Sequence, residues 1–306
     1  MKWESLGCIY EVNNLDKYAA THAMIPTPIK MNETTLRVYY SGRDVDGVGR
    51  PRYVEFDISN GFKVTHESPS IVMDVGRPGT FDDNGVVTCN VIHVPNGDFY
   101  MYYAGFELST KIRYRIFSGL AISRDGGEHF VRYSEAPILD RTNSEPFFRA
   151  GPFVKEVQSG FEMYYVGGGD WIQLENSVKP VYTIKKTFST DGIHWSEPVE
   201  VLQSKDDSEH GFGRPYEFTW KGRRFLYFSV RDSHHETYKL SYAEIIDDQL
   251  VRHDIDFAML HNGEIIENRE LMYAAFFEAN GDLYMLYNTR EFGIDGIFLA
   301  RLIELS

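Results

Sequence analysis

Three arginine–acid pairs recur in this chain, each directly after a segment with the character of a β-strand. They are Arg43 with Asp44, Arg231 with Asp232, and Arg290 with Glu291. A guanidinium group presents planar, bidentate donors that suit a carboxylate, a phosphate or two neighbouring hydroxyl groups. An adjacent carboxylate can move protons or can simply hold the arginine in an ion pair. The pairs therefore predict either one shared polar site or a set of structural ion pairs.

The pairs follow an apolar and aromatic motif that occurs five times. Its second residue lies at positions 39, 102, 164, 227 and 286, so the steps are 63, 62, 63 and 59. Such regular spacing indicates a repeat architecture, in which each unit buries its apolar face against a neighbour. The aromatic content of 15% is typical of packed sheets.

Each repeat has the pattern of a strand meander. A first apolar strand precedes the aromatic one, hairpin-type turns such as Asn96-Gly97 lie between them, and a third strand follows. We expect first strands at 25–29, 86–92, 152–157, 215–220 and 271–277, and third strands at 52–57, 119–123, 183–189, 238–244 and 297–303. The sequence thus predicts an all-β fold, a single five-bladed β-propeller over residues 1–306 whose last blade is completed by a strand near 3–12. A β-sandwich with coincidental spacing is the alternative.

In an antiparallel meander, residues just before the first strand and just after the second converge on one end. We therefore expect carboxylates, arginines and a tryptophan to gather around one opening. The candidate substrate-binding residues are Arg43, Asp82, Glu107, Asp170, Trp171, Arg214, Glu217, Arg231, Asp232, Glu267 and Arg290. The indole of Trp171 offers a flat face on which a sugar ring can stack.

Composition excludes several classes of partner and site. The formal charge of −14 disfavours a nucleic-acid polymer or an anionic membrane surface as a partner. Cys8 and Cys89 form neither a disulfide framework nor a metal-ligand spacing, and the ten histidines, which show no metal pair, are expected in exposed loops. The N-terminal segment does not resemble a signal peptide and no run of about 20 apolar residues occurs, so we expect a cytoplasmic protein of unknown oligomeric state.

The whole chain resembles the five-bladed propeller superfamily of glycoside hydrolases, which includes families 32, 43, 62, 68 and 130. More narrowly, it is similar to hydrolase-like proteins associated with bacterial surface-polysaccharide biosynthesis. The matching segments are 22–28, 41–44, 79–86, 101–105 and 213–215. Residues 123–130 and 189–195 also resemble the Asp-box turn of propeller glycosidases, in which the aspartate accepts hydrogen bonds from turn amides and an aromatic residue packs beneath.

The resemblance implies three carboxylates near the starts of the first strands of blades one, two and three. Asp82 or Asp83 matches the second position and Glu145 the third, whereas residues 22–28 have no carboxylate, so Asp44 is the candidate substitute. Glycoside cleavage requires one protonated carboxyl group and one ionised carboxylate on opposite sides of the bond. Because consecutive strand residues point to opposite faces, we expect Asp83 to line the channel and Asp82 to bond a neighbouring loop.

The leading hypothesis is an enzyme that acts on a glycosidic or sugar-phosphate bond, with Asp83 and Glu145 as the acid–base pair. Arg43, Arg214 and Arg231 would then hold an anionic or polyhydroxylated group of a carbohydrate or nucleotide sugar. A non-catalytic carbohydrate-binding propeller and a phosphorylase or transferase remain as alternatives. No cofactor is expected; a calcium ion in the channel is compatible with the many carboxylates, but their spacing does not require one.

Overall fold

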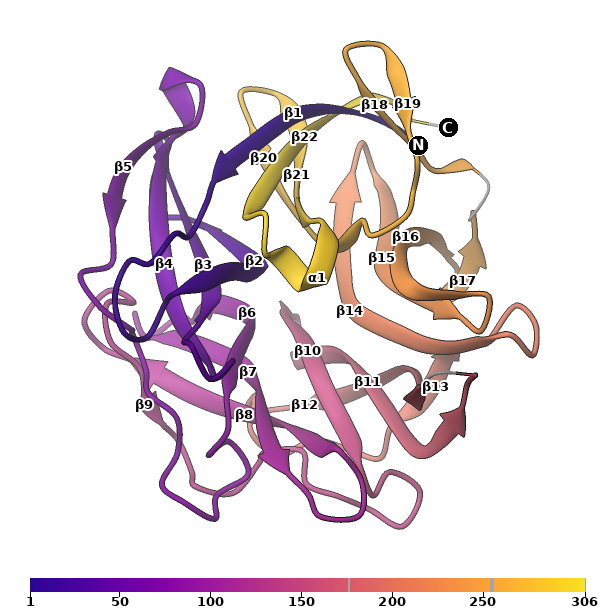
Figure 1. Cartoon of the computed structure of the whole chain (residues 1–306). Coiled ribbons are helices and arrows are strands. Elements are labelled where there is room, and N and C mark those ends of the chain that lie inside the picture. Colours follow the sequence, from indigo (N-terminus) through magenta and orange to yellow (C-terminus); the bar gives the residue numbers. More distant parts are fainter. Residues whose placement is uncertain (176, 254–255, 306) are drawn as a thin grey trace. The chain divides into compact units, whose positions relative to one another are not determined.

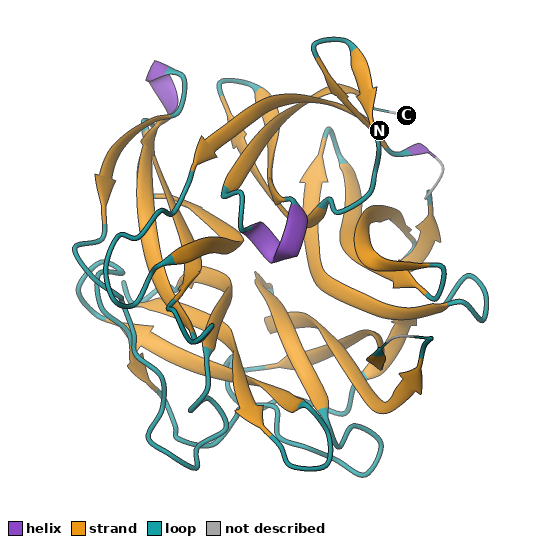
Figure 2. Cartoon of the chain, viewed as in Figure 1, coloured by secondary structure: helices purple, strands orange, loops and turns teal. Residues whose placement is uncertain are grey.

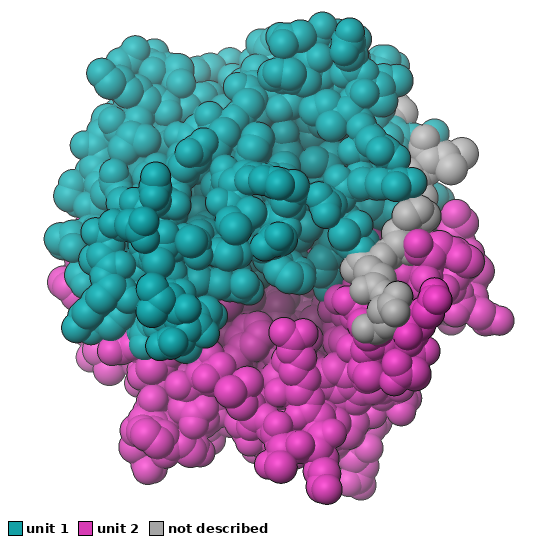
Figure 3. All heavy atoms as spheres, viewed as in Figure 1, with its two compact units in different colours: residues 1–72, 216–229, 237–306 teal, residues 73–215, 230–236 magenta. Residues whose placement is uncertain are grey.

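The computed structural model describes residues 1–175, 177–253 and 256–305. These residues form strands joined by turns, with only short helical pieces (Figures 1 and 2), which confirms the all-β prediction. None of the described helices is long and apolar enough to cross a membrane. The chain divides into two compact units (Figure 3): unit 1 contains residues 1–72, 216–229 and 237–306, and unit 2 contains residues 73–215 and 230–236.

Unit 2 contains two complete meanders, each with a short outer strand. The first is β6 (Val86–His93), β7 (Phe99–Leu108), β8 (Tyr114–Ser123) and β9 (Val131–Arg132). The second is β10 (Phe148–Val157), β11 (Gly160–Gln173), β12 (Val178–Ser189) and β13 (Val199–Leu202). A shared core that includes buried Tyr102 and Leu120 from the first meander and Val154 and Tyr165 from the second packs the two together. Each meander therefore buries its apolar face against its neighbour, as the repeat predicts.

Unit 1 contains the N-terminal and C-terminal meanders. The N-terminal one is β2 (Thr21–Lys30), β3 (Thr35–Arg43), β4 (Gly49–Asp57) and β5 (Lys63–Glu67), with the short helix η1 (Ile58–Asn60) between the last two strands. The C-terminal sheet has the order β19 (Glu264–Ile266), β18 (Ala258–His261), β1 (Lys2–Tyr10), β22 (Ile297–Glu304), β21 (Asp282–Asn288) and β20 (Met272–Ala279). Helix α1 (Arg290–Gly293) follows β21.

The N-terminal strand lies inside the C-terminal sheet. β1 runs beside β22 (Figure 1) and pairs with it antiparallel, with Trp3 opposite Leu302 and Ser5 opposite Ala300. The prediction that an N-terminal strand completes the last meander is therefore confirmed.

The fourth meander contributes residues to both units. It consists of β14 (Glu209–Trp220), β15 (Arg223–Asp232), β16 (His235–Ile246) and β17 (Gln249–Arg252). The start of β14 belongs to unit 2, where it pairs in parallel with β12 through Tyr182 and Gly211. The end of β15 belongs to the same unit, so residues before the first strand and after the second strand of this meander lie together there.

The first strand of each meander carries a backbone irregularity at the same place in the repeat. Ile25, Gly151, Arg214 and Tyr273 have positive φ angles of 53°, 63°, 38° and 59°. In β6 the register shifts between Thr88 and Asn90, around Cys89. These positions are separated by 64, 62, 63 and 59 residues, the same period as the aromatic motif. β-Bulges bend a strand and re-aim its side chains, so the repeat conserves a bend as well as a core within this one chain.

Candidate active site

Residues at the start of β10 and at the end of β11 lie close together in unit 2. Phe148 at the start of β10 lies opposite Gly168 in β11, and its ring centroid lies 5.3 Å from that of Trp171. Tyr182 in β12 contacts the same phenyl ring at 5.7 Å. Phe148, Trp171 and Tyr182, together with Tyr114, whose ring lies 5.6 Å from Trp171, form what we call the aromatic wall.

A group of polar residues, the His210 cluster, adjoins the aromatic wall. It contains His210, Arg231, Asp232, Lys179 and Tyr182. Arg231 is only 7% exposed and donates a hydrogen bond from Nη2 to the Tyr182 hydroxyl at 3.1 Å. Its side chain lies flat against Gly211, where a Cβ atom would come within 2.6 Å of the guanidinium Nε. A glycine at this position therefore lets the guanidinium pack closely on the backbone of β14.

His210 is buried at 4% exposure, and neither of its ring nitrogens has a hydrogen-bond partner among the described residues. Burial lowers the pKa of His210 to about 4; the charges of Arg231 and Lys179 act in the same direction, and Asp232 opposes them. The imidazole is therefore neutral at pH 7, with one nitrogen as a donor and the other as an acceptor. The expectation that the histidines lie in exposed loops is wrong for this residue, because it begins strand β14 beside β12.

Asp82 is a structural carboxylate in the same unit. It is 0% exposed and accepts hydrogen bonds from Arg132 Nε at 2.7 Å, the Tyr103 hydroxyl at 3.0 Å and the Thr80 hydroxyl at 3.0 Å. A Cβ atom on Gly76 would come within 2.1 Å of this carboxylate. Asp82 thus ties the segment before β6 to β7 and β9.

Asp83 is different from its neighbour. It is half-buried, and one carboxylate oxygen accepts the Gly79 amide at 2.8 Å; its other oxygen has no partner in the part of the chain that the structure describes. The side chains of Asp82 and Asp83 make different contacts, as expected. The argument from strand alternation is wrong, however, because residues 81–84 form a turn. Asp83 is therefore the more accessible of the two carboxylates.

Glu145 is buried at 1% exposure and held by three side chains. Its oxygens lie 2.9 Å from Arg149 Nε and 3.2 Å from Lys185 Nζ, and the Tyr165 hydroxyl donates to it at 3.0 Å. Gly167 lies so close that a Cβ atom there would overlap the Glu145 carboxylate, at 1.8 Å. Burial raises the pKa of Tyr165, which keeps its hydroxyl protonated and able to donate.

Glu145 and Asp82 occupy equivalent places in successive repeats, 63 residues apart. The equivalent residue of the first repeat, a further 63 residues upstream, is Ala19. Each of the three packs on the glycine that ends an aromatic motif: Gly167, Gly105 and Gly42. The first repeat therefore has a methyl group where the second and third repeats have carboxylates.

Asp44, the suggested substitute, is committed to a turn of unit 1. Its carboxylate accepts the amides of Asp46 and Val48 at 2.9 Å and Arg50 Nη1 at 2.7 Å. Burial alone would raise the pKa of Asp44, but these hydrogen bonds outweigh burial and hold the pKa below its usual value. Proton transfer by Asp44 would require the turn to open.

The other predicted residues of unit 1 make different contacts, although two of them, Arg43 and Arg290, share the arginine–acid motif. The Arg43 guanidinium lies 5.9 Å from the Phe292 ring centroid, whereas Arg290 is 63% exposed and pairs with Asp295 at 2.6 Å. Glu217 pairs with Arg224 at 3.1 Å and the exposed Glu267 with Arg269 at 2.8 Å. Among them, the Arg290–Asp295 pair fits the structural alternative given for the arginine–acid motif.

The remaining predicted residues of unit 2 lie in and around its strands. Glu107 pairs with Arg115 at 3.2 Å and Arg141 at 3.5 Å. Asp170 is exposed next to Trp171, and Arg214, buried in the bulge of β14, donates to the Cys89 carbonyl at 3.5 Å. The indole Nε1 of Trp171 is buried with no hydrogen-bond partner within the described residues. Sequence reasoning named Trp171 but missed Tyr182 and Lys185, which occupy a strand predicted only as scaffold.

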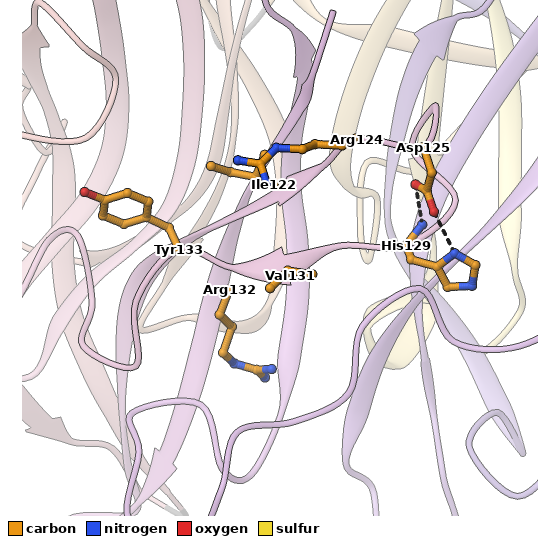
Figure 4. Close-up of a pocket in the computed structure, with 7 residues that line it drawn as sticks. All are labelled: Ile122, Arg124, Asp125, His129, Val131, Arg132 and Tyr133. Carbon is orange, nitrogen blue, oxygen red and sulfur yellow. Dashed lines mark hydrogen bonds and ion pairs between the residues drawn. The ribbon is translucent and has the colours of Figure 1, made fainter.

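A surface cavity of about 480 Å³ lies elsewhere, along β8 and β9 (Figure 4). Ile122, Arg124, Asp125, His129, Val131, Arg132 and Tyr133 line it. Its Asp125 accepts the His129 amide at 3.1 Å and pairs with the His129 ring at 2.8 Å. This geometry, and the equivalent bonds from Ile193 and His194 to Asp191, confirm the Asp-box turns.

No group of three or more His, Cys, Asp or Glu side chains suited to a metal ion occurs within residues 1–175, 177–253 and 256–305. The predicted absence of a cofactor stays a prediction.

Comparisons with known proteins identify relatives of the fold. No family model matches the chain. The uncharacterized protein Rv1502 of Mycobacterium tuberculosis is 26% identical over 98% of this chain and 99% of its own length. Among solved structures, the endo-arabinase of Bacteroides thetaiotaomicron has a TM-score of 0.68 and 9% identity, with 98% of each chain covered.

Two further solved structures extend this likeness. A thermostable family-43 glycoside hydrolase has a TM-score of 0.66 at 15% identity, covering 97% of this chain and 94% of its own. The sucrose-6-phosphate hydrolase of Lactobacillus gasseri has a TM-score of 0.70 at 12% identity, covering 98% of this chain and 62% of its own. The chain therefore shares its fold with the β-propeller glycoside hydrolases of families 43 and 32.

Proposed function

We propose that the chain is a five-bladed β-propeller and a glycosidase-like enzyme that acts on a glycosidic or sugar-phosphate bond. The five meanders, their constant period and the likeness to glycoside hydrolases support this proposal. The ligand is a carbohydrate or a nucleotide sugar, and the setting is bacterial surface-polysaccharide metabolism.

The observation that carries the proposal is a pair of buried polar groups without partners beside an aromatic surface. The Trp171 indole N–H and both ring nitrogens of His210 lack hydrogen-bond partners among the described residues. Buried polar groups in proteins are almost always paired, so unpaired ones call for a functional explanation. A sugar fits both features, because its C–H face packs on aromatic rings and its hydroxyl groups both donate and accept hydrogen bonds.

Asp83 is the proposed proton-transfer residue. It lies in the same unit as the aromatic wall, and one of its oxygens is not used by the turn that holds it. Glu145 is the second carboxylate, kept in place by Arg149 and Lys185. With its position fixed by these ion pairs, its contribution is a negative charge near a developing positive centre on the sugar.

The decisive experiment replaces Asp83 by Asn and measures turnover of a panel of aryl glycosides, oligosaccharides, sugar phosphates and nucleotide sugars. Since Asp83 is half-buried with one internal hydrogen bond, we expect a folded variant whose turnover falls about 100-fold or more. Glu304→Gln, on the exposed ion pair with Lys2, is the matched control. Unchanged turnover in Asp83→Asn would remove Asp83 from the mechanism.

A second candidate is a non-catalytic carbohydrate-binding protein. Ala19 at the first carboxylate position and the internal contacts of Asp82 and Asp44 favour it. Calorimetry combined with product analysis separates the two: a glycan that binds and is recovered intact supports binding alone. Product formation that depends on added phosphate would instead indicate a phosphorylase or transferase.

A further inference from the structure

The His210 cluster has a local charge opposite to that of the chain. Around the neutral imidazole lie the cations Arg231 and Lys179 and the anion Asp232, which leaves one positive charge in excess, whereas the whole chain carries −14. Asp232 accepts the backbone amide of His234 at 3.0 Å, so its carboxylate also serves the turn after β15. A cation would be repelled from such a cluster and an anion attracted.

A second buried histidine among the described residues shows what a structural role looks like. His22, also buried, has its Nδ1 next to the Thr21 hydroxyl at 2.8 Å and its Nε2 next to the Glu291 carbonyl at 3.0 Å. His210 has comparable burial and no such contacts within the described residues. An unmade hydrogen bond at a buried group is costly in free energy, and a bound ligand would supply the missing partners.

We propose that the His210 cluster is an anion subsite, which binds the carboxylate or phosphate group of an acidic sugar between the Arg231 guanidinium and the His210 imidazole. The guanidinium, held by the Tyr182 hydroxyl at 3.1 Å and packed on Gly211, supplies planar charged donors. One imidazole nitrogen donates to an anion oxygen, and the other accepts from a sugar hydroxyl. This inference rests on the proposed function, and it specifies the substrate class as acidic sugars.

The first test uses the full-length protein and the simplest probes, inorganic phosphate and acetate. NMR titration of the histidine ring signals, with His210 assigned from a His210→Asn variant, gives its pKa with and without each anion. A bound anion stabilises the imidazolium form, so we expect phosphate or acetate to raise the pKa of His210 from about 4 towards its ordinary value. A His210 pKa that is the same with and without both anions overturns the proposal.

The second test identifies the source of the anion. Glucose, glucuronate and glucose 6-phosphate share one ring and differ only at carbon 6, and calorimetry compares their dissociation constants. We expect at least one of the two acids to bind about tenfold or more tightly than glucose, because hydrogen bonds to charged groups are the strong ones. Tighter binding of glucuronate would identify a carboxylate as the bound anion, and tighter binding of glucose 6-phosphate a phosphate. Equal binding of all three sugars contradicts the proposal.

Variants separate charge from folding. Arg231→Gln should abolish the preference for acids, Arg231→Lys should keep part of it, and Lys179→Gln, at a partly exposed position, should reduce it a few-fold. Arg124→Gln, on an arginine whose side chain is 81% exposed, should leave it unchanged. A preference that survives Arg231→Gln in a folded protein, as judged by circular dichroism, contradicts the assignment.

These outcomes are distinct from those for the proposed function. Anion binding at His210 without turnover of any substrate would defeat the enzymatic proposal and leave the subsite in place. Turnover of neutral glycosides, with no preference for acids and no change in the His210 pKa, would defeat the subsite alone.

Discussion

Two buried polar residues of unit 2, Glu145 at the start of the third repeat and His210 at the start of the fourth, differ in their contacts. Glu145 is surrounded by Arg149, Lys185 and Tyr165, all within 3.2 Å. His210, which is buried to a similar degree, has no hydrogen-bond partner among the described residues. The Glu145 carboxylate therefore has its partners without a ligand, whereas the His210 ring has none among the described residues.

This contrast separates two uses of a buried polar group. A network whose members all satisfy one another makes the fold more rigid, and the loss of any member leaves a charge unpaired. A buried polar group without hydrogen-bond partners lowers the stability of the free protein, and a bound ligand that supplies those partners restores it. Resemblance to hydrolases directs attention to Glu145, whereas the contacts direct it equally to His210.

The largest expected effect is on stability, at Glu145. Glu145→Ala leaves the buried Arg149 and the partly buried Lys185 without their carboxylate, so the free energy of unfolding should fall by about 3–5 kcal/mol. Urea unfolding followed by circular dichroism measures this loss. Glu267→Ala, which removes only an exposed ion pair, should cost less than about 0.5 kcal/mol. Equal losses in the two variants would mean that the contacts of Glu145 with Arg149, Lys185 and Tyr165 do not stabilise the fold.

The second prediction concerns pH and His210. Its pKa of about 4 in the folded state lies below the ordinary value of about 6.5, so between these values the unfolded chain binds more protons. Stability therefore decreases as the pH falls from about 6.5 towards 4, by up to about 2–3 kcal/mol from this residue. His210→Asn should flatten that part of the curve. Thermal or urea unfolding at several pH values checks this, and identical curves for both proteins would refute the contribution.

The third prediction compares two glycines. In Gly167→Ala the new Cβ would overlap the Glu145 carboxylate, at 1.8 Å, and we expect a loss of about 1–3 kcal/mol in stability. In Gly211→Ala it would lie 2.6 Å from Arg231 Nε, so the guanidinium must move. That variant should lose less stability but most of the preference for acidic sugars. If Gly211→Ala lost more stability and Gly167→Ala lost the preference for acidic sugars, the roles assigned to Glu145 and Arg231 would be wrong.

The smallest effect is expected at the Asp-box turn. Burial opposes ionisation of Asp125, but hydrogen bonds from Ser123 and His129 outweigh it and lower its pKa to about 2. Its contribution is complete above the ordinary value of about 3.9 and is lost as the pH falls through about 2. Because the side chain is half-exposed, Asp125→Asn should cost less than about 1 kcal/mol at pH 7. A loss larger than about 1 kcal/mol would show that the turn contributes more to stability than a half-exposed ion pair is expected to.

The sequence is sufficient to predict the strands, because an apolar motif with a period near 63 residues leaves few other folds. The same logic places the N-terminal strand beside β22. It also separates Asp82 from Asp83, although a turn rather than strand alternation is the cause.

The side-chain contacts are beyond such reasoning, since they depend on residues far apart in the chain. Arg132 reaches Asp82 across 50 positions and Lys185 reaches Glu145 across 40. Nothing local to His210 signals burial, because that follows from the parallel pairing of β14 with β12. An Arg-acid motif likewise does not distinguish the exposed Arg290 from the buried Arg231.

The pairing of β1 with β22 also has a consequence for biosynthesis. β1 lies far along the sequence from both of its partner strands, β18 and β22, so it cannot pair until those strands have been synthesised. Until then the nascent chain leaves both edges of β1 unpaired, which makes β1 a target for chaperones. A circular permutant that joins the two ends and opens the chain in the β4–β5 turn would place β1 directly after β22 and should fold faster.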